Sequence, residues 1–170
     1  MKKLVIAADL HGFYTSWLRL KTFLAQGDTL AIAGDLFDSI YGNHSDVDFQ
    51  PDNVRSEYLA LPHAKHYVYG NCDHTEFFPG AKDHERFNYD GLAILLQHGH
   101  NPSATLEKVD LVIEGHSHVA EIRLKNGIPH INPGSAALPR KGVASYATFY
   151  KGRVDLIAIE TGATIASFSL

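Results

Sequence analysis

The sequence predicts an α/β protein in which two β-sheets form a sandwich flanked by helices. In the first half of the chain, short apolar runs alternate with amphipathic helical patterns, which is typical of strand-helix-strand units and a parallel sheet. In the second half, apolar runs are separated by tight turn signals, which are typical of antiparallel hairpins. No linker, internal repeat or change in composition divides the 170 residues. We therefore expect residues 1–170 to form a single domain in which each half supplies one sheet.

Two amphipathic helices are expected in the first half. The first spans residues 14–26, because the helical pattern stops at Gly27-Asp28. The second begins at Pro51, since proline suits the first turn of a helix. The apolar side chains that fall on one face are Trp17, Leu20 and Leu24 in the first helix and Val54, Tyr58 and Leu61 in the second.

Apolar runs mark the expected strands, and turn dipeptides mark the hairpins. The runs with the clearest polar ends are residues 4–8, 29–33, 66–69, 92–97 and 111–114. The turn signals are Asp90-Gly91, Asn126-Gly127, Lys151-Gly152 and Thr161-Gly162. We also expect a short helix opening at Asn101-Pro102, between the last two of those runs.

Composition and charge exclude several classes of function. The net charge is −4, from 15 basic and 19 acidic residues, so the chain lacks the positive field that stable nucleic-acid binding requires. No apolar run approaches the roughly 18 residues of a membrane span, so we expect no membrane association. A lone cysteine, Cys72, fits a reducing compartment, and we expect a cytoplasmic protein. The oligomeric state is left open.

Polar residues follow five of the expected strands at the point where each strand ends. They are Asp9 and His11, Asp35, Asn71, His98, and His116 with His118. Because ligand sites of open α/β sheets lie beyond the carboxyl ends of the strands, we expect these side chains to converge. Seven oxygen or nitrogen donors without a thiolate are too many for one tetrahedral zinc ion and suit two metal ions that share a carboxylate. Such pairs of metals serve phosphate-ester hydrolysis, which is therefore the predicted chemistry.

The five motifs, in this order, resemble the calcineurin-like metallophosphoesterase superfamily. Its pattern is D-x-H, G-D, G-N-(H/C), H and G-H-x-H. The matching residues are Asp9-Leu10-His11, Gly34-Asp35, Gly70-Asn71-Cys72-Asp73, His98 and Gly115-His116-Ser117-His118. The short chain, the G-N-C-D variant, His98-Gly99-His100 and the turn Asn132-Pro133-Gly134-Ser135 resemble its small bacterial and archaeal phosphodiesterase branch.

The resemblance implies a phosphodiesterase with a dinuclear metal centre and a metal-bound hydroxide that attacks the phosphate diester. It implies one metal held by Asp9, His11 and His118, a second held by Asn71, His98 and His116, and Asp35 as the bridge. The mixed nitrogen and oxygen donors suit manganese first, with nickel, iron, cobalt or zinc as alternatives, and argue against calcium.

Two further residues are candidates for handling the substrate beside Asn71, which is itself expected to act in catalysis. His100 can contact the phosphate, protonate the leaving group or support His98, and a plain surface residue is the competing interpretation. Arg140 can bind a phosphate oxygen, although a solvated loop explains it equally well.

Cys72 departs from the superfamily pattern, because many members carry at this position a histidine thought to protonate the leaving oxygen. We expect a buried, inert thiol at Cys72. Without that acid, esters of phenols should be cleaved much better than esters of alkyl alcohols.

Two alternatives remain open at this point. One is a phosphomonoesterase or nucleotide phosphatase on the same centre. The other is a non-catalytic protein-binding scaffold, since the fold resembles that of the retromer subunit of eukaryotic trafficking. A scaffold predicts missing ligands, whereas all seven are present in this sequence. It is also left open whether Phe77, Phe78 and Tyr41 are exposed or belong to the core.

Overall fold

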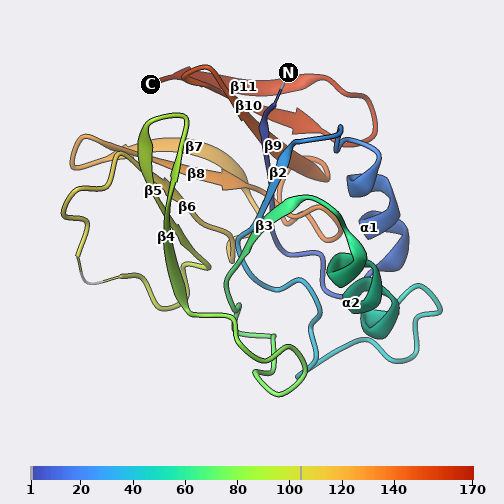
Figure 1. The fold of residues 1–170 in the computed structure, drawn as a ribbon. Helices are drawn as coiled ribbons and strands as arrows, with labels where there is room; N and C mark the ends of the chain where they lie inside the picture. The colour runs from blue at the N-terminus through green and yellow to red at the C-terminus, as the bar shows by residue number, and fades with distance from the viewer. Residues whose placement is uncertain (1, 104) are drawn as a thin grey trace.

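The computed structural model describes residues 2–103 and 105–170 and contains two sheets that pack face to face (Figure 1). The first sheet has six strands in the order β11-β10-β9-β1-β2-β3 and the second has five in the order β4-β5-β6-β8-β7. The predicted two-sheet sandwich is therefore confirmed. The strands of the first sheet are β1 (Leu4–Ala7), β2 (Thr29–Ile32), β3 (Ala64–Tyr67), β9 (Ser145–Tyr150), β10 (Arg153–Ala158) and β11 (Thr164–Ser169). Those of the second are β4 (His84–Tyr89), β5 (Leu92–Gln97), β6 (Leu111–Ile113), β7 (Ala120–Lys125) and β8 (Ile128–Pro133).

The assignment of one sheet to each half of the chain was wrong. Strands β9 to β11 join the first sheet, where β9 pairs antiparallel with β1, and β5, β6 and β8 are mutually parallel within the second. Turn signals specify which neighbouring strands pair, but they do not specify the sheet to which a hairpin is added. The four expected turns are confirmed. In three of them both central residues have positive φ, such as Asp90 (51°) and Gly91 (82°), which suits tight hairpin turns, whereas in Thr161-Gly162 only the glycine does (68°).

β1 lies in the middle of the first sheet and is apolar on both faces. Leu4 and Ile6 contact the core between the sheets, whereas Val5 and Ala7 contact the core beneath the helices. A strand that is buried on both faces has a continuous run of apolar residues, which explains the apolar run over residues 4–8. Figure 1 shows both helices on the face of the first sheet that is turned away from the second sheet.

Helix α1 (Tyr14–Lys21) is shorter than the predicted helix over residues 14–26, while α2 (Pro51–Ala60) begins at Pro51 as expected. After Lys21 the backbone N–H groups of Thr22, Phe23 and Leu24 bond to carbonyls three residues back rather than four. This tighter turn ends the α-helix and still leaves Phe23 and Leu24 packed against the core.

The helix expected at Asn101-Pro102 is absent from the described residues 101–103 and 105–110. Tertiary contacts take the place of helical hydrogen bonds there. The Ser103 N–H donates to Gln97 Oε1 at 2.9 Å, and the Arg86 guanidinium donates to the carbonyls of Thr105 and Glu107 at 2.8 and 2.9 Å. Sequence signals for a helix start carry no information about such distant donors.

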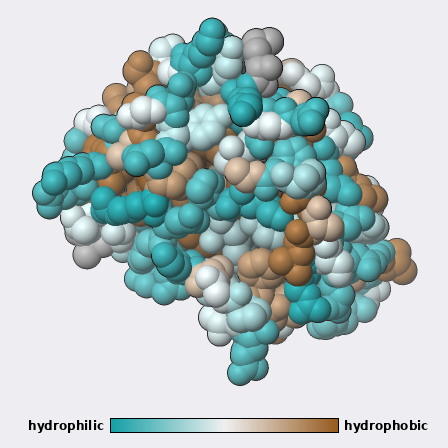
Figure 2. Space-filling view, viewed as in Figure 1, coloured by the Kyte–Doolittle hydropathy of each residue, from teal (hydrophilic) through white to brown (hydrophobic). Residues whose placement is uncertain are grey.

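The three aromatic residues left open by the sequence fall into two groups. Phe77 and Phe78 are half-buried and pack on Phe37, each with a ring-centroid distance of 5.3 Å, so they belong to the core on the helix side. Tyr41 is 72% exposed. Figure 2 shows a face that is mainly hydrophilic, with hydrophobic residues in small scattered groups. Neither helix in the described ranges has the length and apolar character needed to cross a membrane.

Candidate metal centre

The seven candidate ligands come from turns that follow five strands belonging to both sheets. Asp9 and His11 follow β1, Asp35 follows β2 and Asn71 follows β3, all in the first sheet. His98 follows β5, and His116 and His118 follow β6, in the second sheet. The candidate ligands therefore converge from the strand ends of both sheets, as expected where parallel strands end.

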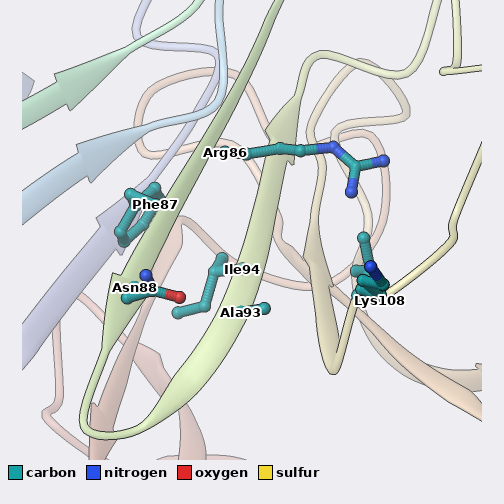
Figure 3. A pocket seen from close by; sticks show the side chains of 7 residues that line it. Arg86, Phe87, Asn88, Ala93, Ile94 and Lys108 are labelled. Carbon is teal, nitrogen blue, oxygen red and sulfur yellow. The ribbon is translucent and has the colours of Figure 1, made fainter.

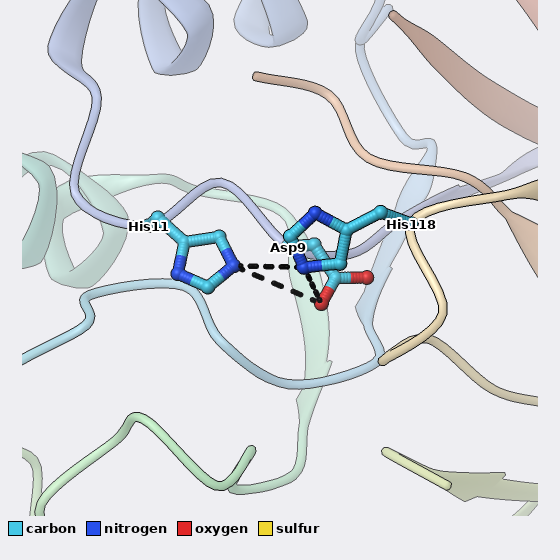
Figure 4. Close-up of side chains that lie close together, drawn as sticks. All are labelled: Asp9, His11 and His118. Carbon is cyan, nitrogen blue, oxygen red and sulfur yellow. Dashed lines mark hydrogen bonds and ion pairs between the residues drawn. The ribbon is translucent and has the colours of Figure 1, made fainter. Parts of the chain in front are cut away.

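The first cluster consists of Asp9, His11 and His118 (Figure 4). The Nε2 atoms of His11 and His118 are 3.2 Å apart. Asp9 Oδ1 is 3.4 Å from His118 Nε2 and 4.0 Å from His11 Nε2. All three side chains are buried, so their donor atoms face one another out of bulk water.

The second cluster consists of Asp9, Asp35 and His98, and Asn71 and His116 lie against it. Asp35 Oδ2 is 3.1 Å from His98 Nε2, and Asp9 Oδ1 is 3.9 Å from the same atom. Asn71 Oδ1 is 3.2 Å from His98 Nε2 and 2.9 Å from His116 Nδ1. Asp35 Oδ2 is also 3.9 Å from His11 Nε2, so this carboxylate faces both clusters.

The outer hydrogen bonds of the histidine rings leave a set of inward-facing donors that fits cations. The Nδ1 atoms of His98 and His118 donate to the carbonyls of Ala33 and Leu138, each at 2.7 Å, because a carbonyl oxygen can only accept. His11 Nδ1 lies 2.9 Å from Asp38 Oδ2 and donates to it. With Nδ1 held by an outer partner, each ring directs Nε2 inward, where it offers a lone pair to a cation once it is deprotonated. The Nε2 atoms of His11 and His118 are within hydrogen-bond distance of each other, and outer partners of this kind support metal-binding histidines.

The backbone of the centre adopts conformations that residues with a Cβ rarely take. Five candidate ligands have positive φ: Asp9 (55°), His11 (51°), Asp35 (50°), His116 (70°) and His118 (59°). Such strain is concentrated at functional sites, where the surrounding structure must hold it. Gly70 shows how closely the turns approach, because a Cβ added there would lie 1.9 Å from Asp35 Oδ1.

The two central carboxyl groups have opposite pKa shifts. Burial raises the pKa of Asp9 to about 7, and the charge of Asp35 adds to the rise. Burial also acts to raise the pKa of Asp35, but the hydrogen bond and the charge of His98 outweigh it and lower this pKa to about 2. Burial acts to lower the pKa of His11 and of His98, yet their carboxylate partners raise both above the ordinary value.

The remaining sequence candidates lie at the rim of the centre. His100 is exposed, and its ring centroid is 5.3 Å from that of His98. Arg140 is exposed, and its charge contributes, after burial, to the lowered pKa of His116 and of His118. Cys72 is half-buried rather than buried, because its turn lies at the open side of the centre. Burial and the charges of Asp35 and Asp38 raise the pKa of its thiol, which keeps it protonated.

Sequence reasoning gave no role to Asp38 or to Ser135, both of which support the ligands. Asp38 orients His11, and its position three residues after Asp35 was the available signal. Ser135 lies in a turn that the sequence singled out without giving it a role. Its Oγ donates to the Asp9 carbonyl at 2.6 Å and accepts from the Leu138 N–H at 2.7 Å, so it holds Asp9 beside the loop that supports His118.

A hollow on the second sheet contains none of the seven candidate ligands (Figure 3). It is lined by Arg86, Phe87, Asn88, Ala93, Ile94, Lys108 and Val109. The Arg86 guanidinium at this hollow already donates to two backbone carbonyls, and the described lining residues include no carboxylate or imidazole that could bind a metal. We therefore place the candidate site at the strand ends.

Comparison with known proteins finds a matching family model and relatives of similar length. Residues 1–151 match the calcineurin-like phosphoesterase superfamily domain. Phosphodiesterase YfcE of Escherichia coli strain K12 is 28% identical over 182 residues, covering 100% of this chain and 99% of the relative. The probable metallophosphoesterase MG207 of Mycoplasma genitalium is 29% identical over 172 residues, covering 92% of this chain and 91% of the relative.

Solved structures show the same arrangement of sheets and helices. The structure of YfcE, a phosphoesterase from E. coli, superposes with a TM-score of 0.85 at 26% identity and covers 98% of each chain. Vps29 from Entamoeba histolytica, crystallised with zinc, superposes with a TM-score of 0.67 at 21% identity and also covers 98% of each chain. The second likeness concerns the fold alone.

Proposed function

The chain belongs to the calcineurin-like phosphoesterase superfamily, and from this membership we propose that it hydrolyses phosphate diesters at a dinuclear metal centre. At the coarser level it is a metal-dependent hydrolase of phosphate esters. The proposal concerns the number of metals, their ligands and the kind of ester.

The position of Asp35 is the observation that carries the proposal. Its Oδ2 is 3.1 Å from His98 Nε2 and 3.9 Å from His11 Nε2, so one carboxylate is available to both clusters. We assign one metal to Asp9, His11 and His118, the other to Asn71, His98 and His116, and the bridging role to Asp35. Donors of nitrogen and oxygen without a thiolate favour manganese, with nickel, iron, cobalt or zinc as alternatives.

Divalent metals held here would stabilise the charge of the phosphoryl transition state and lower the pKa of water. The protein's own residues orient the substrate. Arg140 is a permanent cation close enough to shift the pKa of His116 and of His118, and we assign it to a non-bridging phosphate oxygen. A diester presents a single negative charge to it. His100, exposed beside His98, is assigned to contact with the substrate.

The test compares bis(p-nitrophenyl) phosphate with p-nitrophenyl phosphate as substrates of metal-stripped protein, with and without added manganese. We expect manganese-dependent turnover that is faster on the diester and is lost in Asp35→Asn. Faster turnover of the monoester would favour a phosphomonoesterase. No turnover with any divalent metal, in protein shown to be folded, would favour a protein-binding scaffold.

A further inference from the structure

Asp73 is a buried carboxylate that lies beside the candidate ligands and is not assigned to a metal. It is 5% exposed. Its Oδ1 accepts from the N–H groups of Phe37 at 3.0 Å and Asp38 at 3.2 Å. Its Oδ2 accepts from the Gly70 N–H at 3.1 Å, the Leu36 N–H at 3.3 Å and the Tyr67 hydroxyl at 2.7 Å. Five donors therefore converge on this one carboxyl group.

The donors to Asp73 belong to two turns that carry ligands. Three of them, the N–H groups of residues 36–38, follow Asp35 directly, and the Gly70 N–H precedes Asn71 directly. These turns come from β2 and β3, which are neighbours in the first sheet. A single carboxylate therefore joins the turn of the proposed bridging ligand to the turn of the proposed amide ligand.

The connection extends to His11. Asp73 holds the backbone of Asp38, and the carboxylate of Asp38 accepts from His11 Nδ1 at 2.9 Å. The two turns are also joined by a second hydrogen bond, because Asp35 Oδ1 accepts from the Cys72 N–H at 2.8 Å. Three proposed ligands thus depend on hydrogen bonds that lead to one side chain.

We propose that Asp73 is a positioning residue that sets the geometry of the metal centre through the backbone of two ligand turns. This inference rests on the proposed function, because it assumes that the seven residues bind metal. A positioning role differs from that of an ordinary structural carboxylate. Loss of an ordinary structural carboxylate would lower the stability of the fold and leave metal affinity unchanged, whereas loss of Asp73 should lower metal affinity.

Asp28 provides a matched control within the same sheet. It is 1% exposed, and its two oxygens accept from the N–H groups of Lys3 and Ala25, each at 2.9 Å. It precedes β2, at the end of the strand opposite to Asp35. Asp28→Asn therefore removes a buried carboxylate of the same kind without disturbing a ligand turn.

The experiment is calorimetric titration of manganese into metal-stripped wild-type protein and into Asp73→Asn, Asp28→Asn and Tyr67→Phe, with folding checked by circular dichroism. In Asp73→Asn an amide NH2 group replaces one oxygen and faces N–H donors. We expect manganese affinity to fall about 10- to 100-fold, the range for partners of metal ligands. Tyr67→Phe removes one donor and should lower affinity less, and Asp28→Asn should bind manganese as the wild type does.

The outcomes separate this inference from the proposed function. Wild-type protein that binds no divalent metal overturns the proposed function, and the inference with it. Wild-type protein that binds manganese, beside a folded Asp73→Asn of equal affinity, overturns the inference alone. If Asp73→Asn does not fold, Tyr67→Phe decides: a fall in affinity supports the inference, and wild-type affinity overturns it. An equal loss in Asp28→Asn also overturns it, because the effect would then be one of general stability.

Discussion

At the residue scale, Asp9 connects the protonation of the centre to metal binding. Because its pKa is about 7 in the metal-free protein, Asp9 carries a proton below that pH, and a metal must displace this proton. Displacement of the Asp9 proton alone makes apparent manganese affinity rise by up to about tenfold per pH unit below about pH 7. The raised pKa of His11 and of His98 adds protons that a metal must also displace, so the rise should be steeper than for Asp9 alone. Calorimetric titrations of manganese at several pH values below and above about pH 7 measure this dependence. An affinity that does not change with pH would contradict the prediction.

Cys72 determines the expected choice of leaving group. Its thiol has a raised pKa and stays protonated, but a thiol with such a pKa is a poor proton donor. We therefore expect phenolic esters to be cleaved much faster than alkyl esters of the same phosphate, as measured by initial rates. Introducing the superfamily's histidine, Cys72→His, should narrow the difference. Equal rates on both ester classes in the wild type would exclude this explanation.

At the element scale, the side chain of Glu57 links α2 to α1. Its carboxylate accepts from the Tyr14 hydroxyl at 2.6 Å and from Trp17 Nε1 at 2.9 Å, and it pairs with Lys21. We expect Glu57→Gln to lower the free energy of unfolding by about 1 kcal/mol, since the site is partly exposed and solvent screens the charge. Chemical denaturation measures this. Glu160→Gln, which breaks the exposed pair with Arg19, serves as a control with a smaller effect.

The stabilisation that Glu57 provides between the two helices should depend on pH. Its hydrogen bonds to Lys21 and Tyr14 lower the pKa of Glu57 below its ordinary 4.5. A lowered pKa in the folded state means that the stabilisation is complete above about pH 4.5 and is lost as the pH falls through the lower folded value. The difference in unfolding free energy between wild type and Glu57→Gln should therefore shrink with acidification, and a constant difference would contradict this account.

The sequence alone predicted which side chains converge more completely than it predicted the composition of the sheets. Each candidate ligand follows an apolar run, and strand ends are visible in a sequence because burial stops there. The supporting roles of two acids were not predicted, because Asp38 contacts the distant His11 ring and Asp73 accepts from backbone N–H groups. Both arrangements depend on positive φ values and on neighbouring turns. For the same reason, the capture of the Thr105 carbonyl by Arg86 could not be read from local propensity.

At the scale of the whole molecule, metal binding should stabilise the fold. The candidate ligands come from both sheets, so a bound metal adds a link between elements that already meet through the core and through hydrogen bonds such as that of His98 to the Ala33 carbonyl. Free metal at about 100 times its dissociation constant adds about 2.7 kcal/mol to the free energy of unfolding. For a chain of this length that corresponds to a rise in Tm of roughly 5 to 11 °C. Thermal unfolding with manganese or with a chelator measures the rise, and Asp35→Asn should reduce it.

The pairing of β1 with β9 also determines the order in which a newly made chain can complete its structure. Leu4 lies opposite Phe149, so β1 waits for a partner that is synthesised much later. Parallel pairing with β2 becomes available early, but the other edge of β1 stays unpaired until β9 has left the ribosome. Contacts between such distant segments slow folding and leave an apolar strand edge open to other chains in the meantime. The apolar strand β1 thus needs protection during synthesis until β9 is available.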